Sequence, residues 1–284
     1  MPGHQLSVAL ITDVFHDDPE GERLQAGLAE ARRRGAELAV LPELPLNEWC
    51  PALPGPRDED AEEPDGPRQS RMAAAARAAG IALLGGAIVR SIHSGRRHNT
   101  ALLFDAEGEP VARHVKLHLP DEEGFWETRH YEPGEAPPAV IDQLGLRLGI
   151  QTCSDIQRPQ GTALLATSGA EAVLVPRCTP AASWGRWRLV MRAAALTCAL
   201  YIVSVNRPAP EHGVAIGGPS VVIGPDGEVL LETTDPIALA TLDRRAVREA
   251  RQAYPGYLPM RTDLYAHGWA RIAAALGAIQ EGGA

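Results

Sequence analysis

Three reactive side chains follow three separate apolar runs of the sequence. Glu43 comes directly after "LAVLP", Lys116 directly after "VARHV", and Cys153 directly after "LRLGIQT". A carboxylate can accept the proton of a thiol, the thiolate can attack carbon, and an ammonium can stabilise an oxyanion. The three groups together predict nucleophilic catalysis with a covalent intermediate on the cysteine.

Each of these residues also has an ordinary structural interpretation. Cysteine is among the residues most often buried as a small hydrophobe, and the three other cysteines are interpreted in that way: Cys50, Cys178 and Cys198. A charged residue after a strand is often a solvated loop residue. Cys153 differs because it lies at the carboxyl end of an expected strand, where α/β proteins commonly build their sites. A buried charge such as Glu43 or Lys116 is costly unless it is paired or used.

The histidines offer no base and no metal site by local spacing. His114 and His118 flank Lys116, but no nearby acidic ligand set completes a site, so we expect them at the surface or at a loop edge. The four cysteines lack the CxxC spacing, which disfavours a zinc site or a thioredoxin-like motif. Their pattern favours a reduced, cytoplasmic setting.

Composition excludes several classes of function. The 284 residues carry a net charge of -9 without a long basic cluster, which argues against binding to nucleic acid or to an anionic membrane surface. No apolar run approaches the roughly 20 residues of a bilayer span. The start, "MPGHQLSVALITD", lacks the basic stretch and long apolar stretch of a secretory signal. We therefore expect a small-molecule substrate.

Apolar extended runs alternate with helical patterns along the chain. Strands are expected at residues 6–12, 36–43, 81–89, 98–120 (two strands and a turn), 146–153, 171–176, 201–206, 218–232 (a hairpin) and 236–243. Helices are expected at residues 19–34, 69–79, 160–168 and 184–199, with a short basic helix after residue 243. This pattern indicates one α/β domain with strands inside and helices outside. It does not distinguish a doubly wound sheet from a sandwich of two sheets.

Residues 121–139 have a loop-like composition, and two further segments also lack such a pattern. The acidic residues 58–65 lie in a proline-rich stretch that is typical of a surface loop. They are expected to be solvated, and the alternative is a lid that attracts a cationic substrate. The tail from about residue 250 to 284 is interpreted as a C-terminal extension of the single domain 1–284.

The sequence resembles the nitrilase superfamily of carbon–nitrogen hydrolases, in its amidase and N-carbamoyl amidase branch. The family triad corresponds to Glu43 in "VLPEL", Lys116 in "HVKLHLP" and Cys153 in "GIQTCSD", and a second family glutamate falls on Glu127 in "GFWETRHYEPGE". Further segments match in order over nearly the whole chain. The resemblance implies a four-layer α-β-β-α sandwich. It also implies a homodimer or higher homo-oligomer, with the helices after Cys153 and the C-terminal extension as interface candidates.

The resemblance also implies a mechanism. Glu43 would act as the base, Cys153 as the nucleophile that forms a thioester, and Lys116 with the backbone N–H of Ser154 as the oxyanion site. Glu127 would hold Lys116 or the substrate amine. A non-peptide C–N bond would be hydrolysed with release of ammonia, and neither a metal nor an organic cofactor would take part.

Substrate choice is less defined by the sequence. Nitrile-cleaving members carry Trp-Glu after the nucleophile, whereas Ser154 and Asp155 follow it here, which favours an amide or N-carbamoyl substrate. A nitrilase and a non-catalytic binding module are the alternatives. Trp126, Arg177 and Trp184 are candidate substrate contacts. Arg177 could bind a carboxylate through two hydrogen bonds, or form a structural ion pair, and Trp184 could instead pack in the core.

Overall fold

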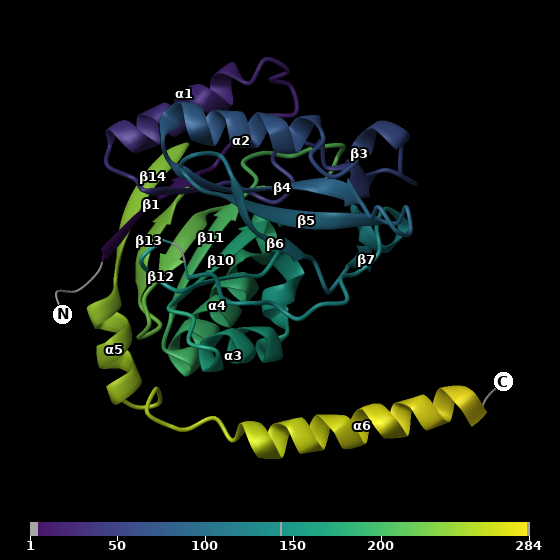
Figure 1. The fold of residues 1–284 in the computed structure, drawn as a ribbon, viewed down its shortest axis with the longest axis vertical. Helices are drawn as coiled ribbons and strands as arrows, with labels where there is room; N and C mark the ends of the chain where they lie inside the picture. The colour runs from purple at the N-terminus through teal and green to yellow at the C-terminus, as the bar shows by residue number, and fades with distance from the viewer. Residues whose placement is uncertain (1–4, 143, 283–284) are drawn as a thin grey trace.

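Two stacked β-sheets form the centre of the protein in the computed structural model, which describes residues 5–142 and 144–282 (Figure 1). The first sheet has the order β14-β1-β2-β4-β5-β6, and β3 pairs with β4. Its strands are β1 (Gln5–Ile11), β2 (Leu38–Val40), β3 (Ala61–Glu62), β4 (Ala82–Arg90), β5 (Arg97–Phe104), β6 (Pro110–Val115) and β14 (Ile237–Asp243). The second sheet has the order β13-β12-β11-β10-β9. Its strands are β9 (Leu148–Ile150), β10 (Ala172–Arg177), β11 (Tyr201–Asn206), β12 (Ser220–Ile223) and β13 (Val229–Thr233).

Helices cover the outer face of each sheet. α1 (Glu22–Arg33) and α2 (Pro67–Ala79) pack on the first sheet, and α3 (Pro159–Thr167) and α4 (Trp184–Cys198) pack on the second. Figure 1 shows the two helix pairs on opposite sides of the strands. The expected four-layer α-β-β-α sandwich is therefore confirmed.

The hydrophobic core divides into layers because successive side chains of a strand point to opposite faces. In β2, Leu38 and Val40 face the second sheet, and Ala39 faces the helices α1 and α2. Leu174 of β10 meets the first sheet in the same inner layer. Full burial of one such Leu or Val side chain contributes about 1.5–3 kcal/mol. Because both faces of these central strands are covered, they are apolar throughout instead of alternating.

The acidic stretch is more ordered than the sequence predicts. It contains the short helix η2 (Asp58–Asp60) and β3, and two of its carboxylates are buried. Asp60 binds Arg57, and Glu62 accepts hydrogen bonds from the backbone N–H groups that begin α2. The expectation of a solvated loop was therefore wrong for these two side chains. Their burial is tolerated because Arg57 pairs with Asp60 and the N-terminal N–H groups of α2 donate to Glu62.

The segment between β6 and β9 also has structure that its composition did not predict. It contains β7 (Asp121–Glu122) and β8 (Phe125–Trp126), which pair with each other, and the short helix η3 (Glu127–Arg129). A hairpin this short carries little hydrophobic periodicity, so its sequence resembles that of a loop.

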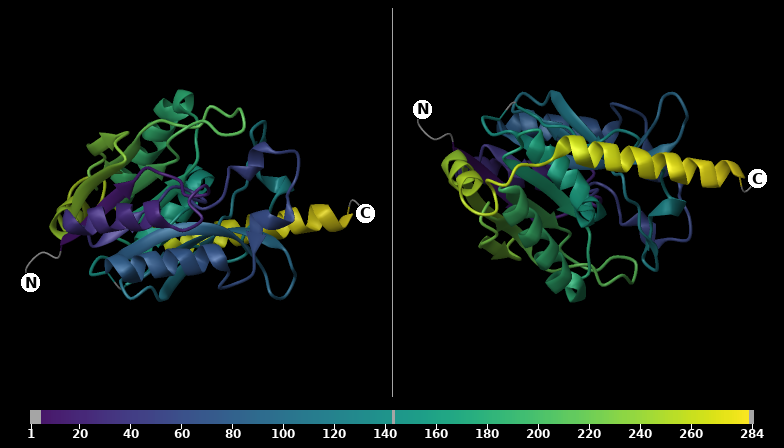
Figure 2. Two further views of the ribbon diagram at one scale, coloured as in Figure 1. Left: turned by 90° about the horizontal axis from the view of Figure 1, so that it is seen from above. Right: turned by 90° about the horizontal axis from the view of Figure 1, so that it is seen from below.

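The C-terminal residues form α5 (Arg244–Gln252) and the long helix α6 (Thr262–Gly282). Figures 1 and 2 show that α6 extends away from the sandwich. Large apolar side chains of α6 are about half exposed: Leu264, Tyr265, Trp269, Ile272 and Leu276. Packing of this extension at an oligomer interface stays a prediction.

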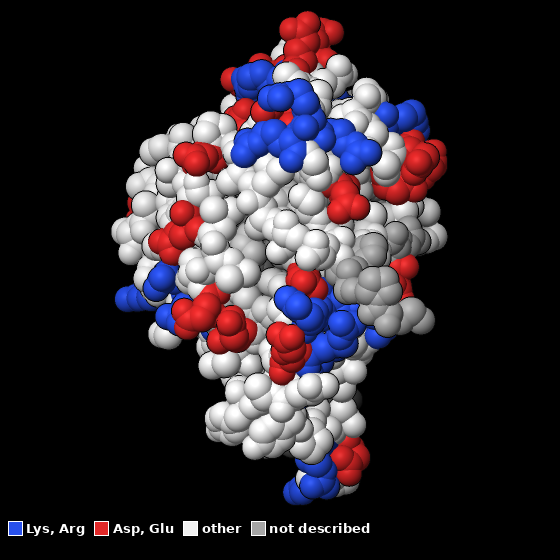
Figure 3. All heavy atoms as spheres, turned by 90° about the vertical axis from the view of Figure 1, so that its left-hand side faces the viewer, with Lys and Arg blue, Asp and Glu red and all other residues white. Residues whose placement is uncertain are grey.

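The surface has no extended field of one charge on the face that Figure 3 shows. Basic side chains lie there in small groups, and acidic side chains border them. Of the helices that the structure describes, none combines the length and apolar composition that a membrane span requires.

Candidate active site

The loops that follow β2 and β6 bring a carboxylate and an ammonium into contact. The Lys116 Nζ lies 2.8 Å from Glu43 Oε1 and 2.6 Å from each carboxylate oxygen of Glu127, which belongs to η3. All three side chains are buried, with at most 1% of their surface exposed. Folding therefore brings together three residues that are far apart in the sequence.

Two residues that the sequence analysis missed hold Glu43 in place. Asn99 of β5 donates a side-chain hydrogen bond of 2.8 Å to Glu43 Oε1, and its carbonyl accepts from the Lys116 N–H at 2.9 Å. Arg207 donates to the carbonyl oxygens of Glu43 at 2.9 Å and Leu44 at 2.8 Å. The second carboxylate oxygen of Glu43 has no hydrogen-bond partner within the described part of the chain.

Cys153 lies at the start of the short helix η4 (Cys153–Gln157), just beyond β9. Its φ of +49° is in the left-handed region, which costs a residue other than glycine about 1–3 kcal/mol. The thiol is 4% exposed, and its Sγ lies 3.6 Å from the carbonyl oxygen of Cys178. Such a strained backbone is common where a side chain must be presented to a substrate.

Burial and charge set the protonation of the cluster. Burial alone would lower the pKa of Lys116, but Glu127 and Glu43 outweigh it and raise that pKa well above its usual value. Burial, together with the nearby Glu43 carboxylate, raises the pKa of Glu127 to about 8 against the pull of Lys116. Burial and Glu43 also raise the pKa of the Cys153 thiol well above its usual value. The thiol is therefore protonated at rest and needs a base to become a nucleophile.

Asp155 joins the Cys153 turn to the loop that carries Lys116. Its carboxylate oxygens lie 2.8 Å from His114 Nε2 and 2.9 Å from His118 Nδ1. They also accept three backbone N–H groups, from Thr152, Leu117 and His118. Burial would raise the pKa of Asp155, but the hydrogen bonds from His114 and His118 lower it far below its usual value.

These contacts correct one expectation. His114 is buried, because its ring reaches Asp155 instead of the solvent. His118 is partly exposed at the loop edge, as expected. The sequence signal that was available for this contact was the aspartate two positions after the cysteine.

The remaining candidate contacts have partners within the protein. The Ser154 hydroxyl donates to the carbonyl oxygen of His118. The half-buried Trp126 ring lies under the guanidinium of Arg129, 3.7 Å from the ring centre. Whether Ser154 and Trp126 contact a substrate stays a prediction.

Arg177 is buried, and burial lowers its pKa to about 10. It donates to Ser204 Oγ at 2.9 Å, to Thr179 Oγ1 and to the carbonyl oxygen of Pro219. The ion pair that we considered as its alternative role is not seen among the described residues. Trp184 lies 5.0 Å from this guanidinium, and its Nε1 donates to Glu232 at 2.9 Å. Both side chains make packing contacts, and their contact with a substrate stays a prediction.

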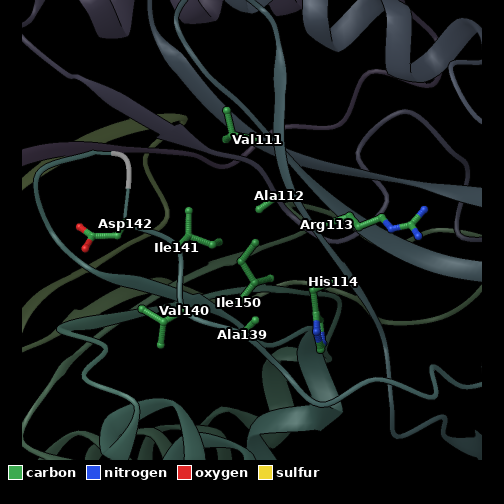
Figure 4. A pocket seen from close by; sticks show the side chains of 9 residues that line it. All are labelled: Val111, Ala112, Arg113, His114, Ala139, Val140, Ile141, Asp142 and Ile150. Carbon is green, nitrogen blue, oxygen red and sulfur yellow. The ribbon is translucent and has the colours of Figure 1, made fainter.

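A hollow of about 490 Å³ lies between β6 and the second sheet, near β9 (Figure 4). Ile141 and Ile150 line it near the middle of the view, and Arg113 extends away from them. Glu43, Lys116, Glu127 and Cys153 do not line it. We place the candidate active site at the buried cluster, because the acid, the amine and the thiol are there.

Known proteins agree with this fold. A model of the carbon–nitrogen hydrolase family matches residues 13–252. The chain is 32% identical over 234 residues to "Hydrolase in pqqF 5'region" of Pseudomonas protegens, covering 81% of this chain and 80% of that protein. It is 30% identical over 250 residues to the chloroplastic omega-amidase of Arabidopsis thaliana, covering 84% and 67%.

A solved structure is similar as well. The amidase from Nesterenkonia sp. has a TM-score of 0.75 and 26% identity, covering 95% of this chain and 98% of that one. A mutant of that amidase shows Michael addition of acrylamide at its active-site cysteine.

A four-layer sandwich with a buried acid–amine–thiol cluster defines an enzyme of the nitrilase superfamily. The chain belongs to the carbon–nitrogen hydrolase family.

Proposed function

We propose that the enzyme hydrolyses the C–N bond of a small amide or N-carbamoyl compound through a thioester on Cys153. The observation that carries this proposal is the buried contact of Lys116 with Glu43 and Glu127 beside the thiol turn. Two neighbouring carboxylates favour the charged form of Lys116, so the ammonium keeps its proton and can act as a fixed positive charge. That charge suits a site where an oxyanion develops.

The first half of the reaction forms the thioester. Glu43 takes the proton from Cys153 Sγ as the sulfur attacks the carbonyl carbon, and the carbonyl oxygen becomes an oxyanion. Lys116 Nζ and the backbone N–H of Ser154 stabilise this oxyanion. The C–N bond then breaks, and Glu43 returns the proton to the leaving ammonia.

The second half releases the product. Water attacks the thioester carbon while Glu43 accepts one of its protons, and the C–S bond breaks as the thiolate recovers a proton. Glu127 keeps Lys116 in position throughout, since both of its oxygens lie 2.6 Å from Nζ. An acid leaves, so the cycle consumes one water and releases one ammonia.

Relatives support the amide as the substrate class. One is an omega-amidase, and another is an amidase whose active-site cysteine has been found with added acrylamide. The serine and aspartate that follow Cys153 favour an amide or N-carbamoyl compound over a nitrile. A nitrile would take the same thiol attack, so it stays the alternative substrate.

Two further properties belong to this proposal. The four cysteines are free thiols, which is typical of proteins in a reducing compartment such as the cytoplasm. We also infer a homodimer or higher homo-oligomer, because the apolar side chains of α6 are exposed in the single chain.

The test is a screen for ammonia release from small amides, N-carbamoyl acids and nitriles. We expect turnover of an amide or N-carbamoyl compound, and a loss of at least about 10³-fold in Cys153→Ala. Intact-mass measurement after rapid quenching should find an acyl adduct on the native protein. Cys198→Ala, which changes a cysteine on α4, serves as the matched control and should keep full activity. Unchanged turnover in Cys153→Ala would refute the mechanism, and turnover of nitriles alone would refute the substrate class.

A further inference from the structure

A second cluster of metal-ligating side chains lies outside the catalytic cluster. Cys50 begins the short helix η1 (Cys50–Ala52), Asp60 ends η2, and His130 follows η3. Their Sγ, carboxylate oxygen and ring nitrogen atoms all lie within 4.8 Å of one another. The three side chains are buried, with exposed fractions of 0%, 4% and 3%. Buried ligand atoms that converge in this way need a common partner or a strong reason to be together.

The imidazole of His130 has one nitrogen available as a ligand. Its Nε2 lies 3.1 Å from the carbonyl oxygen of Leu53, so Nε2 carries the proton and donates it there. The lone pair is then on Nδ1, which has no hydrogen-bond partner among the residues that the structure describes. A backbone carbonyl that fixes the tautomer of a histidine is the usual outer contact of a metal-binding imidazole.

The carboxylate of Asp60 is oriented as well. Arg57 donates from its backbone N–H to Oδ2 at 2.9 Å and from its guanidinium to Oδ1 at 2.8 Å. Oδ1 also accepts from Arg57 Nε at 3.2 Å, so the second lone pair of Oδ2 is the one left for a metal ion. Hydrogen-bonded carboxylates are likewise common around metal centres.

Cys50 supplies the third donor. Its side chain is buried. A divalent ion that binds there displaces the thiol proton to solvent, because the thiolate is the form that binds metal. The thiolate and the carboxylate would offset the charge of the ion, and the Arg57 guanidinium, which already pairs with Asp60, is partly exposed to solvent.

We propose that Cys50, Asp60 and His130 bind a zinc ion at a site separate from the catalytic cluster. A set of one sulfur, one nitrogen and one oxygen donor suits Zn²⁺ better than Mg²⁺ or Ca²⁺. Zinc bonds of about 2.0–2.3 Å place tetrahedral ligand atoms roughly 3.3–3.8 Å apart. The site closes when side chains move inward by about 1 Å, and a water molecule takes the fourth position.

The site would connect two segments that are separate in the sequence. Cys50 precedes the acidic stretch and Asp60 lies within it. His130 lies next to η3, where its N–H donates to the Glu127 carbonyl at 2.9 Å. Figure 1 shows β3 and β7, which flank these segments, at the same end of the molecule. Zinc would therefore steady the backbone of Glu127 without touching the substrate.

Titration with Co²⁺, which gives an optical signal where Zn²⁺ gives none, tests the proposal. Purified full-length protein is stripped with a chelator and titrated with Co²⁺ alone. We expect one equivalent to bind, with thiolate-to-cobalt charge transfer and the visible bands of a four-coordinate ion. Zn²⁺ should displace the cobalt and raise the thermal midpoint of unfolding. Absence of the charge-transfer band would overturn the proposal.

Variants assign the signal to these ligands. Cys50→Ala and His130→Gln should lose the charge-transfer band, and Cys153→Ala should keep it. A band that is lost in Cys153→Ala and kept in Cys50→Ala would refute the site, because the metal would then lie at the catalytic thiol. Circular dichroism establishes that each metal-free variant is folded. If Cys50→Ala does not fold, the alkylation rate of Cys50 in the native protein is measured instead by mass spectrometry in mild urea. Zn²⁺ should slow this alkylation. Equal rates with and without Zn²⁺ would refute the site.

Discussion

Glu43 and Glu127 share a single ammonium group, that of Lys116. Two buried carboxylates share one cation, so the negative charge of one of them is not balanced. Burial of that charge is costly, so one carboxyl group tends to keep its proton. Glu127, whose pKa is raised to about 8, is the one affected in this structure. The excess acid has a use in the proposed mechanism, because Glu43 must exchange protons while Lys116 stays charged.

This arrangement predicts how stability depends on pH. The pKa of Glu127 is raised from 4.5 to about 8, chiefly by burial, so between these values the folded protein binds a proton that the unfolded chain does not. The stability that this proton contributes is fully present below pH 4.5 and is lost as the pH rises through 8. In Glu127→Gln that dependence should disappear. The measurement is the urea midpoint of both proteins between pH 5 and 9.

Both proteins contain the same other titrating groups. The contributions of these groups to the pH dependence of stability therefore cancel when the two proteins are compared. We expect the advantage of the native protein over Glu127→Gln to fall across this range and then to level off. A difference that stays constant, or that grows with pH, would contradict the assignment.

At the scale of elements, Asp155 connects the thiol turn after β9 to the loop after β6. It accepts hydrogen bonds from His114 and His118 and from three backbone N–H groups, so it sets the position of Lys116 relative to Cys153. Asp155 does not touch the proposed reacting atoms. It acts as a positioning residue in the proposed mechanism.

Asp155→Asn is expected to lower kcat about 10- to 100-fold with little change in KM, since a shift of about 1 Å in a catalytic group can cost that much. It should also cost about 1–3 kcal/mol in the free energy of unfolding, because the amide leaves buried donors unpaired. Steady-state kinetics well below the unfolding midpoint separate the two effects. Asp142→Asn, at an exposed aspartate, is the matched control. Normal kcat in folded Asp155→Asn would show that the link is structural only.

Arg207 has a similar role in the loop after β2. It is fully buried, donates to the carbonyl oxygens of Glu43 and Leu44, and pairs with Glu211 at 2.6 Å. Arg207→Met is expected to cost about 3–5 kcal/mol in the free energy of unfolding, because it leaves the Glu211 carboxylate without its partner. The double variant Arg207→Met, Glu211→Gln should recover part of that loss. Equal urea midpoints for the native protein and Arg207→Met would contradict this role.

The sequence predicted the elements better than their contacts. Apolar runs identify β10 and β11 because strands buried on both faces have few polar residues. The stacking of two sheets came from the family resemblance, because a buried strand has the same pattern in a doubly wound sheet. Asn99, Arg207 and Asp155 were not assigned as support for the site. Their partners lie far away in the sequence, and no local spacing marks such hydrogen bonds.

At the scale of the whole molecule, the exposed apolar residues of α6 need an explanation. Tyr265, Trp269 and Ile272 lie on one side of the helix at a spacing of three to four residues, which is the pattern of a buried helix face. Removal of residues 253–284 should therefore lower the oligomeric state, and so should Trp269→Glu. Analytical ultracentrifugation measures this directly. His267→Glu, on another side of the helix, is the control, and an unchanged sedimentation coefficient for Trp269→Glu would contradict the prediction.

Glu43 and Lys116 extend from strands of the first sheet, whereas Cys153 extends from the second. Neither sheet holds all three groups, so the apolar layer between the sheets sets the distance between the proposed nucleophile and the proposed base. A loss of volume deep in that layer, such as Leu174→Ala, should shift one sheet against the other and slow the proposed reaction while Glu43, Lys116 and Cys153 are all still present. The rate of the proposed reaction would therefore depend on how the two sheets are aligned.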